Sequence, residues 1–188
     1  MTKFILVRHG QTEWNKQGIY TGQSDIPLND TGRNQAKAVA VGIQPIKPDR
    51  IFTSDLIRAA ETARSIQNEV AVPLIKDKRL REIHQGEWEG LHVDEIKRLF
   101  TEKFMQRNGD PLNVAPPGGE TIGQVYQRVS DFLYETITKY PQDKIVIVAH
   151  GVVLAIITII SEHIPIEQVF DYIPKNAKIH QLEIQKIR

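Results

Sequence analysis

The sequence predicts a fold of the α/β class with three layers, in which helices flank a central, mostly parallel sheet on both faces. Two observations carry this prediction. Apolar β-type runs, such as 4–7 and 145–149, alternate along the chain with segments of helical periodicity, which is the pattern of a largely parallel sheet. The 188 residues suit one domain of generous size, and no linker divides 1–188.

The first elements after the opening strand follow from local signals. A polar, turn-rich segment at 11–30 leads to a helix expected over about 31–42, where apolar residues recur at helical spacing. A short strand is expected at 50–53. The side chains of Ser54 and Asp55 are then expected to cap a helix that carries apolar residues as far as Val70.

The sequence pattern in the second half of the chain is less regular. Residues 72–75 predict a weak, peripheral strand, because their proline cannot donate to a ladder. Residues 92–104 look helical, and 108–119, with three Pro and three Gly, predict a surface loop of the length that lids and binding loops have. A capping box at Thr121 opens a long amphipathic helix. The remaining elements are a buried helix over 151–161 and an alternating strand over 178–187.

Composition restricts the partners and the chemistry. With 24 basic and 23 acidic side chains, no bulk field favours nucleic acid or an anionic membrane. The absence of Cys excludes disulfides, thiolate nucleophiles and thiolate metal sites, and agrees with a cytoplasmic location. Neither a signal peptide nor a membrane span is recognisable. We therefore expect a cytoplasmic protein with no nucleic-acid or membrane partner, whose monomeric or homodimeric state the sequence leaves open.

Two strand-like runs end in the same dipeptide, His9-Gly10 and His150-Gly151. Parallel strands deliver their carboxyl ends to one edge of the sheet, where ligands bind. Arg8 precedes the first histidine, and Arg58 lies in the first turn of a helix that follows another strand. Guanidinium groups match phosphate or carboxylate oxygens, and helix N-termini add partial positive charge. Together these residues predict an anion pocket, with phosphate as the expected anion.

Other interpretations of the same residues exist. A single His-Gly after a strand is commonly only a turn, and an Arg in a first helical turn commonly makes a surface ion pair. A zinc or manganese site is a third interpretation. Its candidate ligands are His9, His84 and His150 with Glu82 or Glu87. We expect no metal, because two guanidinium groups beside a dication would be electrostatically adverse.

Short motifs then extend the pattern over nearly the whole chain. They are Leu6 to Asn15, Thr21-Gly22, Pro27 to Asn29, Thr53 to Leu56, Arg58-Ala59, Glu61 to Ala63, Leu80 to Ile83, Gly86 to Gly90, Gly118 to Thr121 and Ala149 to Gly151. In this order and spacing they resemble the histidine phosphatase superfamily, the phosphoglycerate-mutase-like fold. The resemblance is greatest to the small bacterial phosphatases of this family, which include broad-specificity and α-ribazole phosphatases. A phosphoserine phosphatase or a sugar-phosphate phosphatase would fit as well.

The resemblance implies a role for each matching residue. His9 is expected to take the phosphoryl group as a phosphohistidine, and Glu82 to protonate the leaving alkoxide and then activate water. Arg8, Arg58 and His150 are expected to stabilise the phosphoryl oxygens. The expected substrate-binding residues are Arg8, Asn15, Thr21, Gly22, Arg58, Glu82, His150 and Gly151. The expected ligand is a small-molecule phosphomonoester, with no cofactor; an alternative is that Glu82 merely pairs with Arg79 or Arg81.

Hydrolysis competes with two other functions. Mutases of the family are longer, carry a basic insertion for a second acid group, and commonly have Asn where this chain has Val152. In this chain the basic residues of the short middle region, Lys97, Arg98, Lys103 and Arg107, are expected on a solvent-exposed face. The balance favours a phosphatase, with a phosphoglycerate mutase as the alternative enzyme. A phosphate-binding module without activity is the third possibility.

Overall fold

The computed structural model describes residues 1–184, so residues 185–187 of the predicted closing strand lie outside the described part. Five strands form one sheet in the order β3-β2-β4-β1-β5, in which only β5 is antiparallel to its neighbour. The predicted α/β class with a mostly parallel sheet is confirmed. The strands are β1 (Thr2–Arg8), β2 (Arg50–Thr53), β3 (Leu74–Lys76), β4 (Lys144–Ala149) and β5 (Ile179–Ile184).

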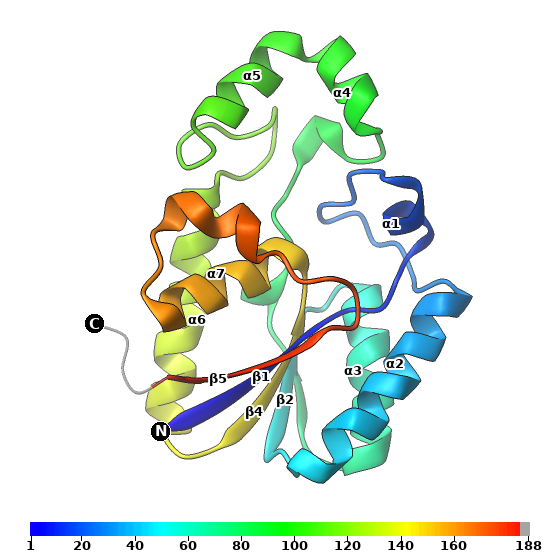
Figure 1. Cartoon of the computed structure of the whole chain (residues 1–188), viewed down its shortest axis with the longest axis vertical. Coiled ribbons are helices and arrows are strands. Elements are labelled where there is room, and N and C mark those ends of the chain that lie inside the picture. Colours follow the sequence, from blue (N-terminus) through cyan, green and yellow to red (C-terminus); the bar gives the residue numbers. More distant parts are fainter. Residues whose placement is uncertain (185–188) are drawn as a thin grey trace.

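Helices cover both faces of the sheet, as Figure 1 shows. The helices are α1 (Glu13–Gln17), α2 (Asp30–Ile43), α3 (Ile57–Val70), α4 (Val93–Leu99), α5 (Thr101–Gly109), α6 (Ile122–Lys139) and α7 (Gly151–Glu162). Alternate residues of β1 pack into the hydrophobic cores on opposite faces of the sheet. Phe4 and Leu6 pack in the core under α6 and α7, whereas Ile5 and Val7 pack in the core under α2 and α3. This two-sided burial explains why the central strands are apolar throughout.

Strand order decides where the functional residues meet. β1 and β4 are adjacent and parallel, and Arg8 pairs in register with Ala149. His9 and His150 therefore follow adjacent strands at the same edge. β2, on the other side of β4, leads into α3 and delivers Arg58 to that edge. Neighbouring strands of a sheet lie about 5 Å apart, which is why residues so distant in sequence come together.

Three local predictions need correction. The 11–30 segment contains the short helix α1, whose capping box joins Thr12 and Asn15; five residues are too few to show helical periodicity. The 92–104 helix is broken at Phe100, which leaves helical geometry and turns its ring toward Trp88. Neither Ser54 nor Asp55 caps α3.

The cap on α3 comes from a residue distant in sequence. The Asp25 carboxylate accepts a hydrogen bond of 2.7 Å from the backbone N–H of Ile57, the first residue of the helix. The Ser54 hydroxyl instead accepts one of 3.2 Å from Leu56, and Asp55 pairs with Arg81. A capping residue supplied by another loop leaves no signal in the local sequence.

Above the carboxyl ends of the strands lies a cap, which we define as α4, α5 and the 110–119 loop (Figure 1). Trp88, which precedes these segments in the chain, is buried and contacts the rings of Tyr20, Phe100 and Phe104. The predicted 108–119 loop is confirmed except for its first two residues, which end α5. Gly86 holds the loop close, because a side chain at this positive φ of 55° would overlap the Pro117 carbonyl oxygen. Within residues 1–184, no helix is both long and apolar enough to cross a membrane.

Candidate active site

Four predicted residues converge at the sheet edge below the cap. The imidazole rings of His9 and His150 have their centroids 5.1 Å apart. A Cβ atom placed on Gly151 would lie 3.5 Å from Glu82 Oε2 and 3.6 Å from the guanidinium carbon of Arg8. The prediction that β1 and β4 bring their His-Gly ends together is therefore confirmed in geometry.

His9 is oriented through its own backbone. Its ring is buried, and Nδ1 lies 2.7 Å from the carbonyl oxygen of Gly10. A carbonyl can only accept, so Nδ1 carries the proton and Nε2 holds the free lone pair. Burial lowers the pKa of His9 well below its usual value, and the charges of Arg58 and Arg8 lower it further. The ring is consequently neutral at pH 7, as a nitrogen nucleophile must be.

His150 opens the buried helix α7 as its N-cap residue, without a side-chain capping bond. Its ring is fully buried, and neither ring nitrogen has a hydrogen-bond partner within residues 1–184. Burial and the nearby Arg58 charge lower the pKa of His150 well below its usual value. Burying a polar side chain without hydrogen-bond partners is costly, so both ring nitrogens are available to bind a ligand. Its position beside His9 suits contact with an anion there.

Two arginines give this pocket its positive charge. Arg8 Nη1 donates to the Pro174 carbonyl at 2.6 Å, and Arg58 donates to the carbonyls of Ser24 and Gly22 at 2.8 and 2.7 Å. Burial lowers the pKa of both guanidinium groups, an effect that the Glu82 carboxylate opposes. Carbonyl partners orient a guanidinium without neutralising it, so the pocket keeps its positive charge for an anion.

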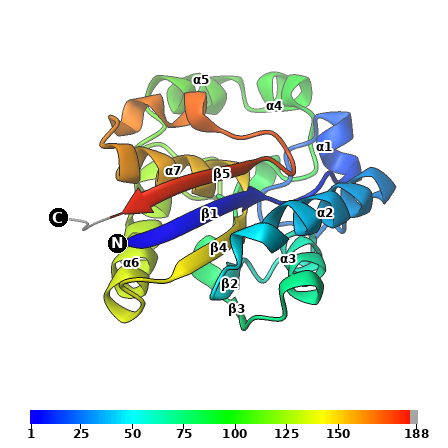
Figure 2. The same ribbon diagram turned by 60° about the horizontal axis from the view of Figure 1, so that its bottom comes forward.

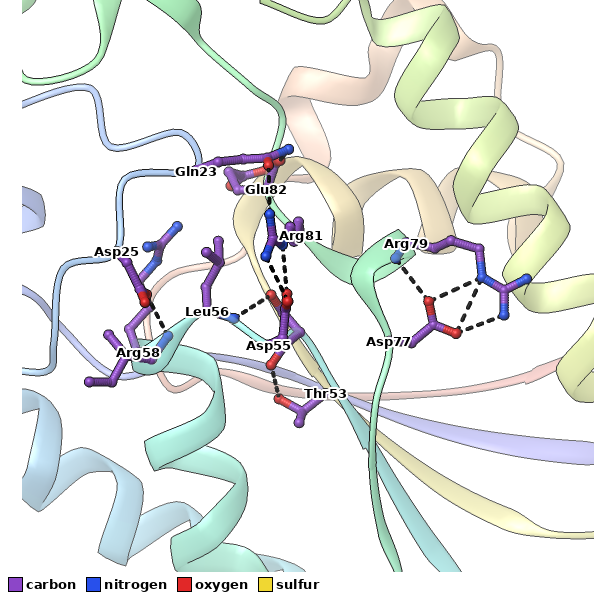
Figure 3. A network of polar contacts seen from close by, with 12 residues as sticks. Gln23, Asp25, Thr53, Asp55, Leu56, Arg58, Asp77, Arg79, Arg81 and Glu82 are labelled. Atoms are coloured by element: carbon purple, nitrogen blue, oxygen red, sulfur yellow. Dashed lines mark hydrogen bonds and ion pairs between the residues drawn. The ribbon is translucent and has the colours of Figure 1, made fainter.

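Glu82 does not pair with its neighbouring arginines, so that alternative is wrong. Arg81 forms two short bonds to Asp55, and Arg79 pairs with Asp77, as Figure 3 shows. The Glu82 carboxylate accepts instead from two backbone N–H groups, Ile83 at 3.0 Å and Val152 at 3.4 Å. This holds an acid side chain within reach of Arg8 and Gly151 without a fixed counter-ion.

The other predicted binding residues take less direct positions. Asn15 Oδ1 accepts from the Thr12 N–H at 3.2 Å, within the capping box of α1. The Gly22 carbonyl holds Arg58, and Gly22 itself has a positive φ of 50°. The Thr21 hydroxyl donates only a long bond of 3.4 Å to the Ile19 carbonyl. The structure therefore gives Gly22 a supporting contact and brings Thr21 into no observed contact with the histidines.

Asn176 is a site residue that the sequence did not indicate. Its amide nitrogen donates to the His9 carbonyl at 3.0 Å and to Asn15 Oδ1 at 3.2 Å. It also lies 3.4 Å from the Gly10 carbonyl, the acceptor that orients the His9 ring. Asn176 follows a 3-10 helix, Ile166–Tyr172, and is far from His9 in sequence, so only the antiparallel return of β5 reveals this contact.

The described part of the chain shows no cluster of side chains that would support the metal interpretation. Within residues 1–184, no three His, Asp or Glu side chains lie close enough together to hold a metal ion. His84 lies instead beside Glu89, with its Nε2 3.6 Å from the carboxylate. The expectation that no metal takes part stays a prediction, because the chemistry itself has to be tested with chelator.

The two buried histidines predict an acid-sensitive stability. Their folded-state pKa values lie below the unfolded value of about 6.5, so below that pH the unfolded chain binds protons that the folded chain does not. We expect the free energy of unfolding to fall between about pH 6.5 and 5.5, by about 1 kcal/mol per histidine and pH unit. Urea unfolding across this range measures the slope. His150→Asn should reduce the slope, and an unchanged slope would show that His150 does not cause the loss.

Comparison with known proteins places the chain in a family. The family model of the histidine phosphatase superfamily (branch 1) matches residues 4–188. The chain belongs to the histidine phosphatase superfamily. The predicted resemblance is confirmed, and the fold agrees with solved histidine phosphatases. The α-ribazole phosphatase of Shigella flexneri superposes with a TM-score of 0.90 at 26% identity, covering 97% of this chain and 90% of the other.

Curated relatives of this histidine phosphatase carry two kinds of name. Phosphoserine phosphatase 1 of Hydrogenobacter thermophilus is 37% identical over 152 residues, which are 81% of this chain and 72% of the relative. The 2,3-bisphosphoglycerate-dependent phosphoglycerate mutase 2 of Gloeobacter violaceus is 33% identical, over 90% of this chain and 80% of the relative. The predicted enzyme class, a phosphoric monoester hydrolase of this superfamily, is confirmed at this level.

Proposed function

We propose that this histidine phosphatase hydrolyses a small-molecule phosphate monoester through a phosphohistidine on His9, without a metal or other cofactor. The observation that carries the proposal is the neutral, oriented ring of His9 among three groups able to hold phosphoryl oxygens, Arg8, Arg58 and His150. A cytoplasmic location, a single domain and the absence of nucleic-acid or membrane partners stay predictions.

In the first half-reaction, His9 Nε2 attacks the phosphorus and the P–O bond to the leaving group breaks. The cationic guanidinium groups of Arg8 and Arg58 stabilise the charge on the three equatorial oxygens. Glu82, in its protonated form, gives its proton to the departing alkoxide, which leaves as an alcohol. The phosphoryl group then remains on Nε2, while the Nδ1 proton stays hydrogen-bonded to the Gly10 carbonyl.

In the second half-reaction, the Glu82 carboxylate accepts a proton from water as that water attacks the phosphohistidine. The P–N bond breaks, inorganic phosphate forms, and both His9 and Glu82 return to their initial protonation states. The same carboxylate thus serves as acid and as base. Its two backbone N–H contacts, from Ile83 and Val152, keep it at one position for both steps.

Hydrolysis and mutase activity differ in the acceptor of the phosphoryl group. The short middle region and Val152 after the second His-Gly support hydrolysis, because a mutase has to hold a second hydroxyl in place of water. The test supplies 3-phosphoglycerate and a panel of phosphomonoesters, with and without EDTA. We expect release of inorganic phosphate to exceed formation of 2-phosphoglycerate and to persist in chelator. Faster formation of 2-phosphoglycerate would favour the mutase, and no turnover would favour the binding module.

Arg107, in the cap, favours a narrower class of substrate within the phosphomonoesters, namely those that carry a second acid group. Arg107, predicted to face solvent, is only 7% exposed; its guanidinium packs over the Trp88 ring at 5.9 Å. Its buried Nε has no hydrogen-bond partner within residues 1–184, and Trp88 Nε1 and Gln85 Oε1 are also buried without partners there. The local pattern at 97–107 could not show this, because Trp88 comes from another segment. A buried cation without a partner is costly, so we propose that Arg107 binds a second acid group of the substrate.

This assignment predicts a difference between two matched substrates. O-phosphoserine and O-phosphoethanolamine differ only in a carboxylate. In Arg107→Met we expect kcat/KM for phosphoserine to fall by about 30-fold or more, as expected for a lost charged contact of about 2 kcal/mol. Activity on phosphoethanolamine should hardly change. Arg98→Met, an exposed arginine on α4, is the matched control. Equal losses on both substrates would mean that Arg107 only supports the cap.

A further inference from the structure

A cavity of about 430 Å³ lies beside the edge strand β5, apart from the residues of the proposed reaction. Buried side chains of Leu6 and Leu154 line it from the core, and Lys175, Lys178 and His180 line it from the surface. Figure 2 shows the two elements that flank it, with β5 in front and α7 above. Its volume lies within the usual range for small-molecule sites, about 300–1,000 Å³.

The surface side of this cavity is cationic. No acid occurs among its lining residues in the described part of the chain. The amines of Lys175 and Lys178 make no ion pair or hydrogen bond to another residue within 1–184, whereas His180 Nε2 lies 3.7 Å from the Glu162 carboxylate. A buried apolar lining next to unpaired cations matches a ligand with an apolar body and one acid group.

The segment that borders the cavity also holds the site residues. We call residues 174–178 the strap. The Pro174 carbonyl accepts from the Arg8 guanidinium at 2.6 Å, and the Ala177 N–H donates to the Arg8 carbonyl at 3.0 Å. Asn176 donates to the His9 carbonyl at 3.0 Å. The strap therefore lines the cavity through Pro174, Lys175 and Lys178, and contacts the anion pocket through its backbone and Asn176.

We propose that the cavity binds a carboxylate with a single unbranched apolar chain, and that binding there is coupled to binding in the anion pocket. The chain lies against Leu6 and Leu154, and the carboxylate faces Lys175 and Lys178. Both ligands act on the strap, the cavity ligand through Pro174 and the two lysines and the anion through Arg8. Holding the strap in this position serves both sites, so we expect the coupling to be positive. The coupling rests on the proposed function of Arg8, whereas binding in the cavity does not.

Three probes of equal chain length test the cavity by titration calorimetry: decanoate, decanol and decyltrimethylammonium. We expect decanoate to bind at least ten-fold more tightly than the other two. The double variant Lys175→Gln, Lys178→Gln should lose this preference, whereas Lys37→Gln, Lys139→Gln, which removes two exposed lysines elsewhere, should keep it. Thr158→Trp, which fills the cavity, should abolish binding of decanoate while thermal unfolding stays cooperative. Equal binding of decanoate and decanol, or no effect of the lysine pair, overturns the proposal.

Vanadate, a phosphate mimic, tests the coupling. Saturating vanadate should tighten decanoate binding by about three-fold, and saturating decanoate should tighten vanadate binding by the same factor. Weaker binding of decanoate in the presence of vanadate would mean that both ligands compete for the anion pocket. An unchanged affinity for decanoate would mean that the strap does not couple the two sites. Either result overturns the coupling. If vanadate does not bind at all, the proposed function fails, but the decanoate titration still tests whether the cavity binds a carboxylate.

Discussion

Replacing His9 with Ala is expected to lower kcat by at least about 10⁴-fold, the scale of loss when a covalent nucleophile is removed. In the proposed mechanism the His9 ring supplies the oriented, unprotonated nitrogen that attacks phosphorus; its Nδ1 is held by the Gly10 carbonyl at 2.7 Å. The pocket's cations remain, so the variant should still bind vanadate. Steady-state hydrolysis of p-nitrophenyl phosphate and a vanadate titration measure both effects.

His150→Ala is the matched comparison for this prediction. It removes a buried imidazole from the same pocket, 5.1 Å from the His9 ring, but leaves the proposed phosphoryl acceptor in place. We expect slower phosphorylation of the enzyme, with a loss in kcat/KM of about 10²-fold to 10³-fold, as for a lost charge-stabilising donor. If His9→Ala retained as much activity as His150→Ala, the two histidines would not have the different roles proposed for them.

Replacing Glu82 with Gln should have an effect that depends on the leaving group. An alkoxide needs a proton to depart, whereas p-nitrophenolate does not, so the general acid matters for the first and hardly for the second. For alkyl phosphates we expect kcat/KM to fall by about 10³-fold, within the usual 10²-fold to 10⁴-fold for general acids. For p-nitrophenyl phosphate, kcat/KM should fall less than ten-fold. The measurement is a leaving-group series on both enzymes.

The second half-reaction supplies an independent check on Glu82. In the proposed mechanism the same carboxylate activates water. Glu82→Gln should therefore slow hydrolysis of the phosphoenzyme, so that the intermediate accumulates with p-nitrophenyl phosphate as substrate. A burst of p-nitrophenol followed by a slow steady state is the expected trace. Arg81→Gln is a suitable control, because Arg81 pairs with Asp55 and not with Glu82. Equal losses over the whole leaving-group series would show that Glu82 only shapes the pocket.

The sequence could predict those parts of the site that adjacent strands deliver. Arg8 and His9 lie at the end of β1, and His150 follows β4, so apolar runs and strand-end residues were sufficient to place them. The helix at 122–139 was predicted for a similar reason, because its capping box and apolar stripe are local in sequence.

Contacts between distant segments could not be predicted in this way. Asn176 reaches His9 only because β5 returns antiparallel beside β1, a pairing that no local pattern encodes. Asp25 caps α3 from another loop, and Arg107 is buried because Trp88 packs against its helix. In each case tertiary packing decides the environment of a polar residue, whereas periodicity reports only the side of its own helix or strand on which it lies.

The central claim is that His9 carries the phosphoryl group, and direct detection of the phosphoenzyme tests it. The enzyme is mixed with a ³²P-labelled phosphomonoester, quenched within milliseconds, and digested for identification of the labelled peptide. We expect label that is acid-labile and alkali-stable, located on the peptide containing His9, and absent in His9→Ala. Label on another residue, label stable to acid, or turnover without any label during the steady state would contradict the claim.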